Sequence, residues 1–148
     1  NPIDFNQTKH LQITMLTVFV YGTLKRGFCR SAYLRDQEFM GTAVTHPIYG
    51  LVDCGAYPGL IDVRNLCDSR VPQAIHGEIY CIDSDCLREL DLVEDIDNGL
   101  YRFDQIQIKS FNWKAKNLKA KIPQSVYAYF YSRDSTNLPD CGNEWTKK

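Results

Sequence analysis

Short apolar runs, separated by polar and turn-forming residues, are the main pattern along this chain. The first run, residues 17–22, is β-branched and aromatic and stops at a glycine, which is typical of a buried strand. Later segments either alternate apolar with polar residues or form short apolar blocks beside Pro and Gly. The further strands predicted in this way cover residues 38–45, 48–52, 60–63, 74–82, 100–109 and 125–132.

A helical period appears in fewer places than the strand pattern. One helix is predicted over residues 84–95, where Asp83 and Ser84 supply a polar start, and a short one near residues 31–34. Strands therefore outnumber helices, and the two do not alternate as they do in a doubly wound sheet. We predict an α+β fold in which a mixed, mostly antiparallel sheet closes towards a small barrel.

One carboxylate falls on the apolar face of the predicted helix. At about 100° per residue, one arc of this helix holds Cys86, Leu87, Leu90 and Val93. Glu94 lies within that arc, at about 20° from Leu87. Burial of an unpaired carboxylate costs free energy, so such a position indicates a functional group, a paired ion or a helix that ends earlier. The alternative interpretation is that Glu94 lies in a frayed last turn and reaches water.

The first predicted strand ends in a glycine corner, Tyr21-Gly22-Thr23-Leu24. Gly22 allows backbone conformations that other residues avoid, and it lets a ligand approach the main chain. The N–H groups of Thr23 and Leu24 are then free to point at an anion or at a carbonyl oxygen. The alternatives are an ordinary turn after a strand and a phosphate loop, although the Gly-Lys-Ser/Thr ending of such a loop does not follow this corner.

The length of the chain, 148 residues, suits one domain with its own core. We expect an N-terminal extension at residues 1–14, a domain at 15–133 and a tail at 134–148. The tail is rich in Asn, Pro, Asp and Gly and is expected on the surface. The longest apolar run before the corner, residues 13–20, is far shorter than the roughly 20 residues that span a bilayer. A soluble protein of the cytoplasm is therefore expected.

Charge and cysteine content narrow the range of partners. The formal net charge of -1 argues against a broad footprint for nucleic acid or for a membrane surface. The six cysteines form no Cys-x-x-Cys pair and show no Cys/His zinc spacing, so we expect reduced thiols and no metal site. The expected partner is a small molecule that a local site selects, and the sequence predicts no oligomeric state.

Five stretches resemble, in order, the γ-glutamylcyclotransferase-like family, particularly its γ-glutamylamine cyclotransferase and AIG2-like branch. They are Val-Phe-Val-Tyr-Gly-Thr-Leu-Lys-Arg-Gly at 18–27, Tyr-Pro-Gly-Leu at 57–60, His-Gly-Glu-Ile-Tyr at 76–80, Leu-Asp-Leu-Val-Glu at 90–94 and Leu-Tyr-Arg at 100–102. Together they extend over most of residues 17–133. The resemblance implies a small β-barrel flanked by a few helices, with a substrate cavity at one end.

The resemblance also implies a reaction. In enzymes of this family the residue that matches Glu94 is the general base. The α-amino group of a γ-glutamyl compound attacks its own γ-carbonyl, which forms 5-oxoproline and releases an amine, and no cofactor is needed. The corner Gly22-Thr23-Leu24 is then a candidate to bind the substrate's carboxylate or its γ-carbonyl, and both options stay open. Tyr21 is expected to line the cavity, and the hydroxyl of Tyr101 is expected to reach it.

Two alternatives remain at this point. A protein of the same fold could bind or sense a small ligand without catalysis, since a fold does not determine a function. Glu78 is the rival carboxylate, but its strand face also carries His76 and Tyr80, which favours a structural hydrogen bond. The sequence does not predict which γ-glutamyl compound would be the substrate.

Overall fold

A computed structural model describes residues 15–65, 70–114 and 123–148. The predicted N-terminal extension at 1–14 lies outside the described residues. In the described ranges the strands are β1 (Leu16–Val20), β2 (Glu38–Thr45), β3 (Tyr49–Asp53), β4 (Pro58–Asp62), β5 (His76–Ile82), β6 (Tyr101–Ile106), β7 (Ile108–Trp113) and β8 (Val126–Tyr131). The helices are α2 (Ser84–Val93) and the short 3-10 helices η1 (Ser31–Leu34), η2 (Val63–Asn65) and η3 (Ile96–Asn98).

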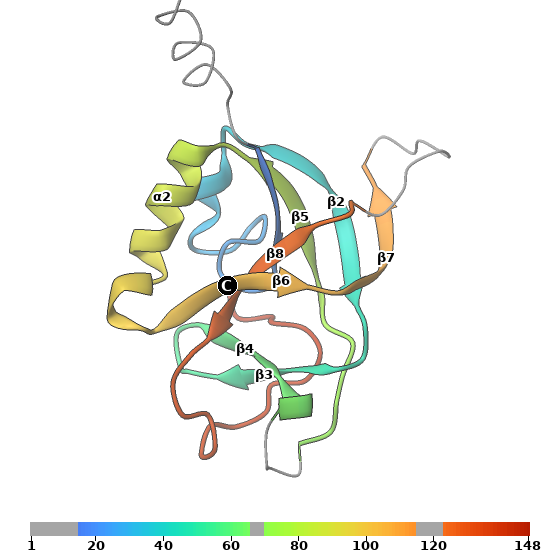
Figure 1. The fold of residues 1–148 in the computed structure, drawn as a ribbon, viewed down its shortest axis with the longest axis vertical. Coiled ribbons are helices and arrows are strands. Elements are labelled where there is room, and N and C mark those ends of the chain that lie inside the picture. Colours follow the sequence, from blue (N-terminus) through green and yellow to red (C-terminus); the bar gives the residue numbers. More distant parts are fainter. Residues whose placement is uncertain (1–14, 66–69, 115–122) are drawn as a thin grey trace, which may run out of the picture.

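All of these strands belong to one mixed sheet that curls into a half-barrel (Figure 1). Its order is β3-β4-β8-β1-β5-β2-β7, and β6 also pairs with β8. Strand β8 runs parallel to β1 and to β4, while the other pairs are antiparallel. The predicted α+β fold with a mostly antiparallel sheet is confirmed. Within the described ranges, no helix is long and apolar enough to cross a membrane.

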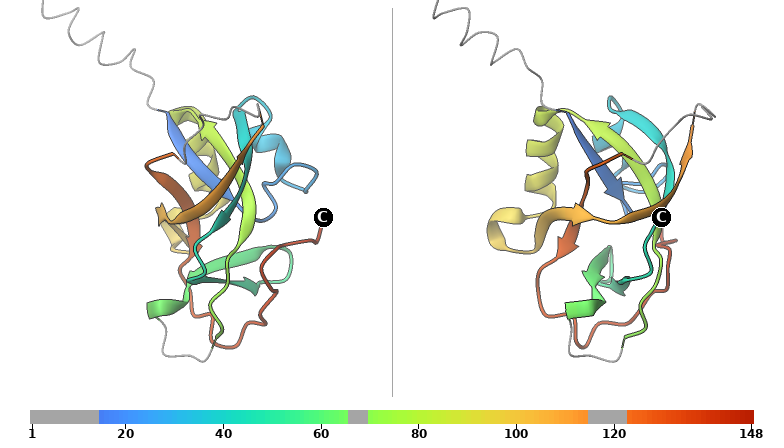
Figure 2. Two further views of the ribbon diagram at one scale, coloured as in Figure 1. Left: turned by 90° about the vertical axis from the view of Figure 1, so that its right-hand side faces the viewer. Right: turned by 45° about the vertical axis from the view of Figure 1, so that its right-hand side comes forward.

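Strand β1 separates the two larger of the three hydrophobic clusters that the described residues form. Side chains alternate along a strand. Phe19 packs in one apolar cluster, whereas Val18 and Val20 pack in the other, which also contains buried side chains of α2. All three are buried, which explains why the sequence of β1 is apolar on both faces. Helix α2 stands along one side of the curled sheet, and the β3–β4 hairpin lies at its lower end (Figures 1 and 2). The end of β1 therefore lies deep in the molecule.

The strand predicted at 100–109 is two strands, β6 and β7, which meet at Gln107. Strand β6 pairs with β8, whereas β7 pairs with β2. At the change of partner, His46 N–H donates to the carbonyl of Gln107 at 2.9 Å, and Gln107 N–H donates to the hydroxyl of Tyr49 at 2.9 Å. The apolar alternation continues through this point, so the sequence pattern alone does not reveal the break.

The C-terminal tail departs from the expectation of a surface segment at Trp145, which is 1% exposed. The tail runs along β3, where Asp53 N–H donates to the carbonyl of Pro139 at 2.8 Å and Cys141 N–H donates to that of Leu51 at 3.0 Å. The prediction is wrong at Trp145 because the large apolar area of one indole outweighs a polar local composition.

Candidate functional site

Glu94 ends α2 and faces the core. Asp83 caps the start of the helix, where its carboxylate accepts the N–H of Cys86 at 2.8 Å. At the other end the N–H of Glu94 donates to the carbonyl of Leu90 at 2.8 Å, so Glu94 keeps the helical position that the spacing predicts. Asp95 then turns the chain away with a positive φ of 53°. The Glu94 residue is only 8% exposed.

The carboxylate of Glu94 makes no hydrogen bond or ion pair with any residue in the described ranges. Burial raises its pKa from 4.5 to about 7, and the charge of Arg30 acts in the opposite direction. The net pKa is raised because the buried carboxylate loses its hydration and no hydrogen-bond partner within the described residues compensates for that loss. Glu94 can therefore exchange a proton near neutral pH.

The glycine corner lies in the same region as Glu94. A Cβ atom on Gly22 would lie 2.6 Å from Cγ of Pro58, so only glycine fits here. The loop tightens through Lys25 N–H, which donates to the carbonyl of Gly22 at 3.1 Å, and Arg30 N–H, which donates to that of Thr23 at 2.9 Å. By contrast, the N–H groups of Gly22, Thr23 and Leu24 have no acceptor among the residues that the structure describes. These three amides are available to a ligand.

A narrow hollow joins the corner to Glu94. Its wall is completed by the β3–β4 hairpin and by side chains of β6 and β8, and it contains about 350 Å³ of space out to its mouth. The centre of a water molecule can occupy only about 20 Å³ of that space. Arg30 and Tyr57 are half-buried, whereas the other residues of the wall are buried, so these two form the mouth.

Tyr21 and Tyr101 both line the hollow, as expected, but their hydroxyl protons have protein acceptors. Tyr21 donates to the carbonyl of Tyr129 at 2.5 Å, and Tyr101 donates to the carbonyl of Pro58 at 2.5 Å. Burial raises the pKa of each phenol, so both stay neutral near neutral pH. These two hydrogen bonds connect the segments that form the wall of the hollow.

Sequence reasoning missed Arg30 and Tyr129 as residues of the hollow. Tyr129 follows the strand alternation of β8, but Arg30 lies in a loop without a periodic pattern. The rival Glu78 does not line the hollow, and its Oε1 accepts the N–H of Arg26 at 2.8 Å, which is the structural role that we favoured. No cluster of His, Cys, Asp and Glu within the described residues could hold a metal ion.

Comparisons with known proteins identify one matching family and several relatives. The family model described as "Gamma-glutamyl cyclotransferase, AIG2-like" matches residues 18–147. A relative from Vibrio cholerae is 41% identical over 90 residues, which cover 61% of this chain and 70% of that protein. Human gamma-glutamylaminecyclotransferase is 31% identical over 127 residues, covering 80% of this chain and 79% of that protein. The crystal structure of a mouse AIG2-like protein superposes with a TM-score of 0.66 at 27% identity, covering 87% of each chain.

Proposed function

The chain belongs to the AIG2-like γ-glutamylcyclotransferase family, and we propose that it cyclises a γ-glutamyl amine or γ-glutamyl amino compound to 5-oxoproline, with Glu94 as general base. The single observation that carries this proposal is that the Glu94 carboxylate and three amides share one hollow and have no partner within the described residues. A fold does not need such groups, whereas acyl transfer needs a base and hydrogen-bond donors for an oxyanion.

The pKa of Glu94 suits the proton that has to be removed. An α-ammonium group has a pKa of about 8 and an exposed Glu about 4.3, a mismatch that corresponds to roughly 5 kcal/mol. Burial raises the pKa of Glu94 to about 7, which reduces the mismatch to about one unit, or roughly 1.4 kcal/mol. A bound ammonium group would lower the pKa of Glu94 again, so its pKa in the substrate complex lies between the value of an exposed Glu and the value without substrate.

The proposed reaction balances without a cofactor. Glu94 takes a proton from the α-ammonium group, and the free amine attacks the γ-carbonyl carbon to form a tetrahedral oxyanion. The proton held by Glu94 passes to the leaving nitrogen, the C–N bond to the leaving amine breaks, and the carbonyl of 5-oxoproline forms. The attacking nitrogen loses its second proton to Glu94, and this proton passes to the released amine, which departs as an ammonium ion. The amides of the glycine corner supply donors for one of the substrate's oxygen groups.

Substrate entry requires the mouth of the hollow to open, because its interior has room for about one water molecule. Arg30 and Tyr57 are the half-buried residues of the wall. Their side chains can rotate outward without breaking a hydrogen bond or ion pair within the described residues. We therefore propose that these two side chains admit the γ-glutamyl group.

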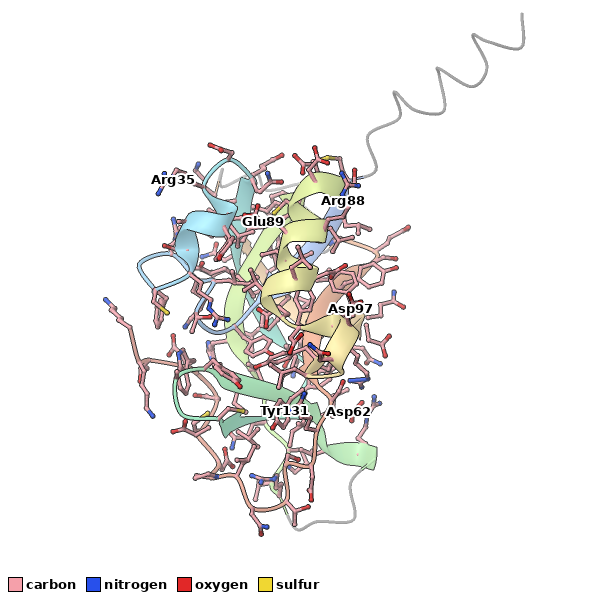
Figure 3. All side chains as sticks on the ribbon, turned by 90° about the vertical axis from the view of Figure 1, so that its left-hand side faces the viewer. Arg35, Asp62, Arg88, Glu89, Asp97 and Tyr131 are labelled. Atoms are coloured by element: carbon pink, nitrogen blue, oxygen red, sulfur yellow. The ribbon has the colours of Figure 1, made fainter. Side chains whose placement is uncertain are left out.

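The test is turnover of a panel of γ-glutamyl amines, γ-glutamyl amino acids and glutathione, with 5-oxoproline measured by mass spectrometry. We expect product from at least one compound, and Glu94→Gln should lower its kcat by about 10² to 10⁴-fold. Glu89→Gln is the matched control, because Glu89 is an exposed carboxylate on the same helix (Figure 3). Its kcat should stay at the level of the unmodified protein.

Two results would contradict the proposal. One is a folded protein that forms no 5-oxoproline from any compound of the panel. The other is turnover that Glu94→Gln leaves intact. Saturable binding of a γ-glutamyl compound without any turnover would instead support a ligand-binding role on this fold.

A further inference from the structure

Arg30 brings a positive charge to the mouth of the hollow. It follows Gly22 by eight residues, but its N–H donates to the carbonyl of Thr23 at 2.9 Å, so the loop folds back and returns Arg30 to the corner. Its half-buried side chain lines the hollow together with Glu94. A guanidinium group is therefore held beside the proposed base by the loop that also forms the corner.

The guanidinium of Arg30 is not used by the fold. Within the described ranges it makes no hydrogen bond or ion pair, although its charge acts on Glu94. Other arginines do have such partners: Arg26 lies 3.5 Å from Glu78, and Arg64 lies 2.8 Å from Asp62. An unpaired guanidinium in a half-buried position indicates a binding role rather than a structural one.

We infer that Arg30 binds the α-carboxylate of the γ-glutamyl substrate, which leaves the amides of the glycine corner for the γ-carbonyl oxygen. This inference rests on the proposed function. The α-carbon carries both the nucleophilic amine and the carboxylate, so a substrate whose amine faces Glu94 also brings its carboxylate near Glu94. Two carboxylates at close range repel each other and need a full positive charge to compensate.

No other cation of the described residues lines this hollow. Lys25 follows the glycine corner directly, but its Nζ donates to the carbonyl of Trp145 at 2.8 Å in a different groove. Arginine also matches a carboxylate with two parallel N–H donors, which lysine does not. Arg30 is therefore the residue that fits this group.

The two kinds of donor suit two different tasks. The α-carboxylate is charged both before and during the reaction, so a side chain that closes over it lowers KM. The oxyanion exists only in the transition state and is best stabilised by donors that are already in place. The amides of Thr23 and Leu24 are fixed by the loop, whereas the side chain of Arg30 is half-exposed. On this contrast we assign the α-carboxylate to Arg30 and the γ-carbonyl oxygen to the two amides.

The kinetic test compares a γ-glutamyl amine with the same compound in which the α-carboxylate is a carboxamide. Arg30→Gln should raise KM for the carboxylate substrate about tenfold to hundredfold, with kcat changed by less than about threefold. It should leave KM for the carboxamide unchanged, and Arg30→Lys should recover part of the loss. Arg35→Gln is the control, since Arg35 is an exposed arginine (Figure 3) that does not line the hollow.

A binding test separates this inference from the proposed function. Calorimetry compares 5-oxoproline with pyrrolidin-2-one, which lacks only the carboxylate. We expect the unmodified protein to prefer 5-oxoproline and Arg30→Gln to lose that preference while its melting temperature stays the same. No preference in the unmodified protein, an unchanged preference in Arg30→Gln, or equal losses with both substrates would overturn the role of Arg30. Failure to form 5-oxoproline would overturn the proposed function instead.

Discussion

The hollow around Glu94 and a wider groove on the same molecule differ both in size and in the partners of their polar groups. The groove lies beside β2, β5 and β7 and is lined by Lys25, Glu78, Glu144 and Trp145 among others. The centre of a water molecule can occupy about 590 Å³ of the groove but only about 20 Å³ of the hollow. On size alone the groove would be the candidate site.

The polar groups give the opposite answer. The two charged groups of the groove that are not exposed, Lys25 and Glu78, both have partners. Nζ of Lys25 donates to the carbonyl of Trp145 at 2.8 Å and lies 4.4 Å from the ring centre of Phe28, while Glu78 is paired with Arg26. In the hollow, the carboxylate of Glu94 and the amides of the corner have no partner within the described residues. The comparison teaches that buried polar groups without protein partners, rather than volume, mark the candidate site.

The largest expected effect concerns the groove. Trp145→Ala should lower the free energy of unfolding by about 4 kcal/mol, because it empties a buried aromatic position. The kcat of the folded fraction should stay the same, since Trp145 does not line the hollow. Trp145→Phe should cost less, because it keeps a ring and removes a buried indole N–H that has no acceptor among the described residues.

Urea unfolding and initial rates at equal folded fractions measure these two quantities. Leu92→Ala is the control, because Leu92 is 75% exposed on α2 and its loss should change stability by less than about 0.5 kcal/mol. A large fall of kcat in folded Trp145→Phe would show that the groove takes part in the reaction, and the comparison would fail.

The next largest expected effect is the contribution of Glu94 to the pH dependence of stability. Its pKa is about 7 in the folded state and 4.5 without burial. Between these values the folded protein holds a proton that the unfolded chain has lost, so stability falls by about 1.4 kcal/mol per pH unit, or about 3 kcal/mol in total. Glu94→Gln cannot titrate, so its stability relative to the unmodified protein should increase by that amount from about pH 4 to pH 8.

Urea unfolding at both pH values measures this difference. If the difference in stability between the two proteins is the same at both pH values, the carboxylate of Glu94 is hydrated. The hollow would then contain no buried carboxylate without a partner, and it would not differ from the groove in this respect.

Periodic features of the structure could be predicted from the sequence, whereas features that depend on loop closure could not. Helical spacing places Glu94 on the apolar face, although it left a frayed last turn as the alternative, and the position of Gly22 follows from the end of an apolar strand. The return of Arg30 to the corner depends on one hydrogen bond to the carbonyl of Thr23, which no spacing in the sequence reveals.

The sequence also did not reveal where a strand changes its neighbour or which residue of the tail is buried. Gln107 separates two strands that have different neighbours, although the alternation continues through it. Trp145 lies in a polar tail but is held in the core, where Lys25 donates to its carbonyl. In both cases tertiary contacts outweigh the local pattern, because the decisive interaction involves a residue that is distant in the sequence.

The smallest expected effect tests the wall of the hollow. Tyr101 lines it, but its hydroxyl donates to the carbonyl of Pro58 at 2.5 Å, so Tyr101→Phe should cost about 1 kcal/mol of stability and less than tenfold in kcat. Tyr127→Phe is the control, because the hydroxyl of Tyr127 has no hydrogen-bond partner among the described residues. Urea unfolding and kcat/KM measure both variants. A loss of kcat/KM above tenfold without a loss of stability would mean that the hydroxyl of Tyr101 leaves Pro58 to bind substrate, and the hollow would then hold one more ligand donor than its hydrogen bonds indicate.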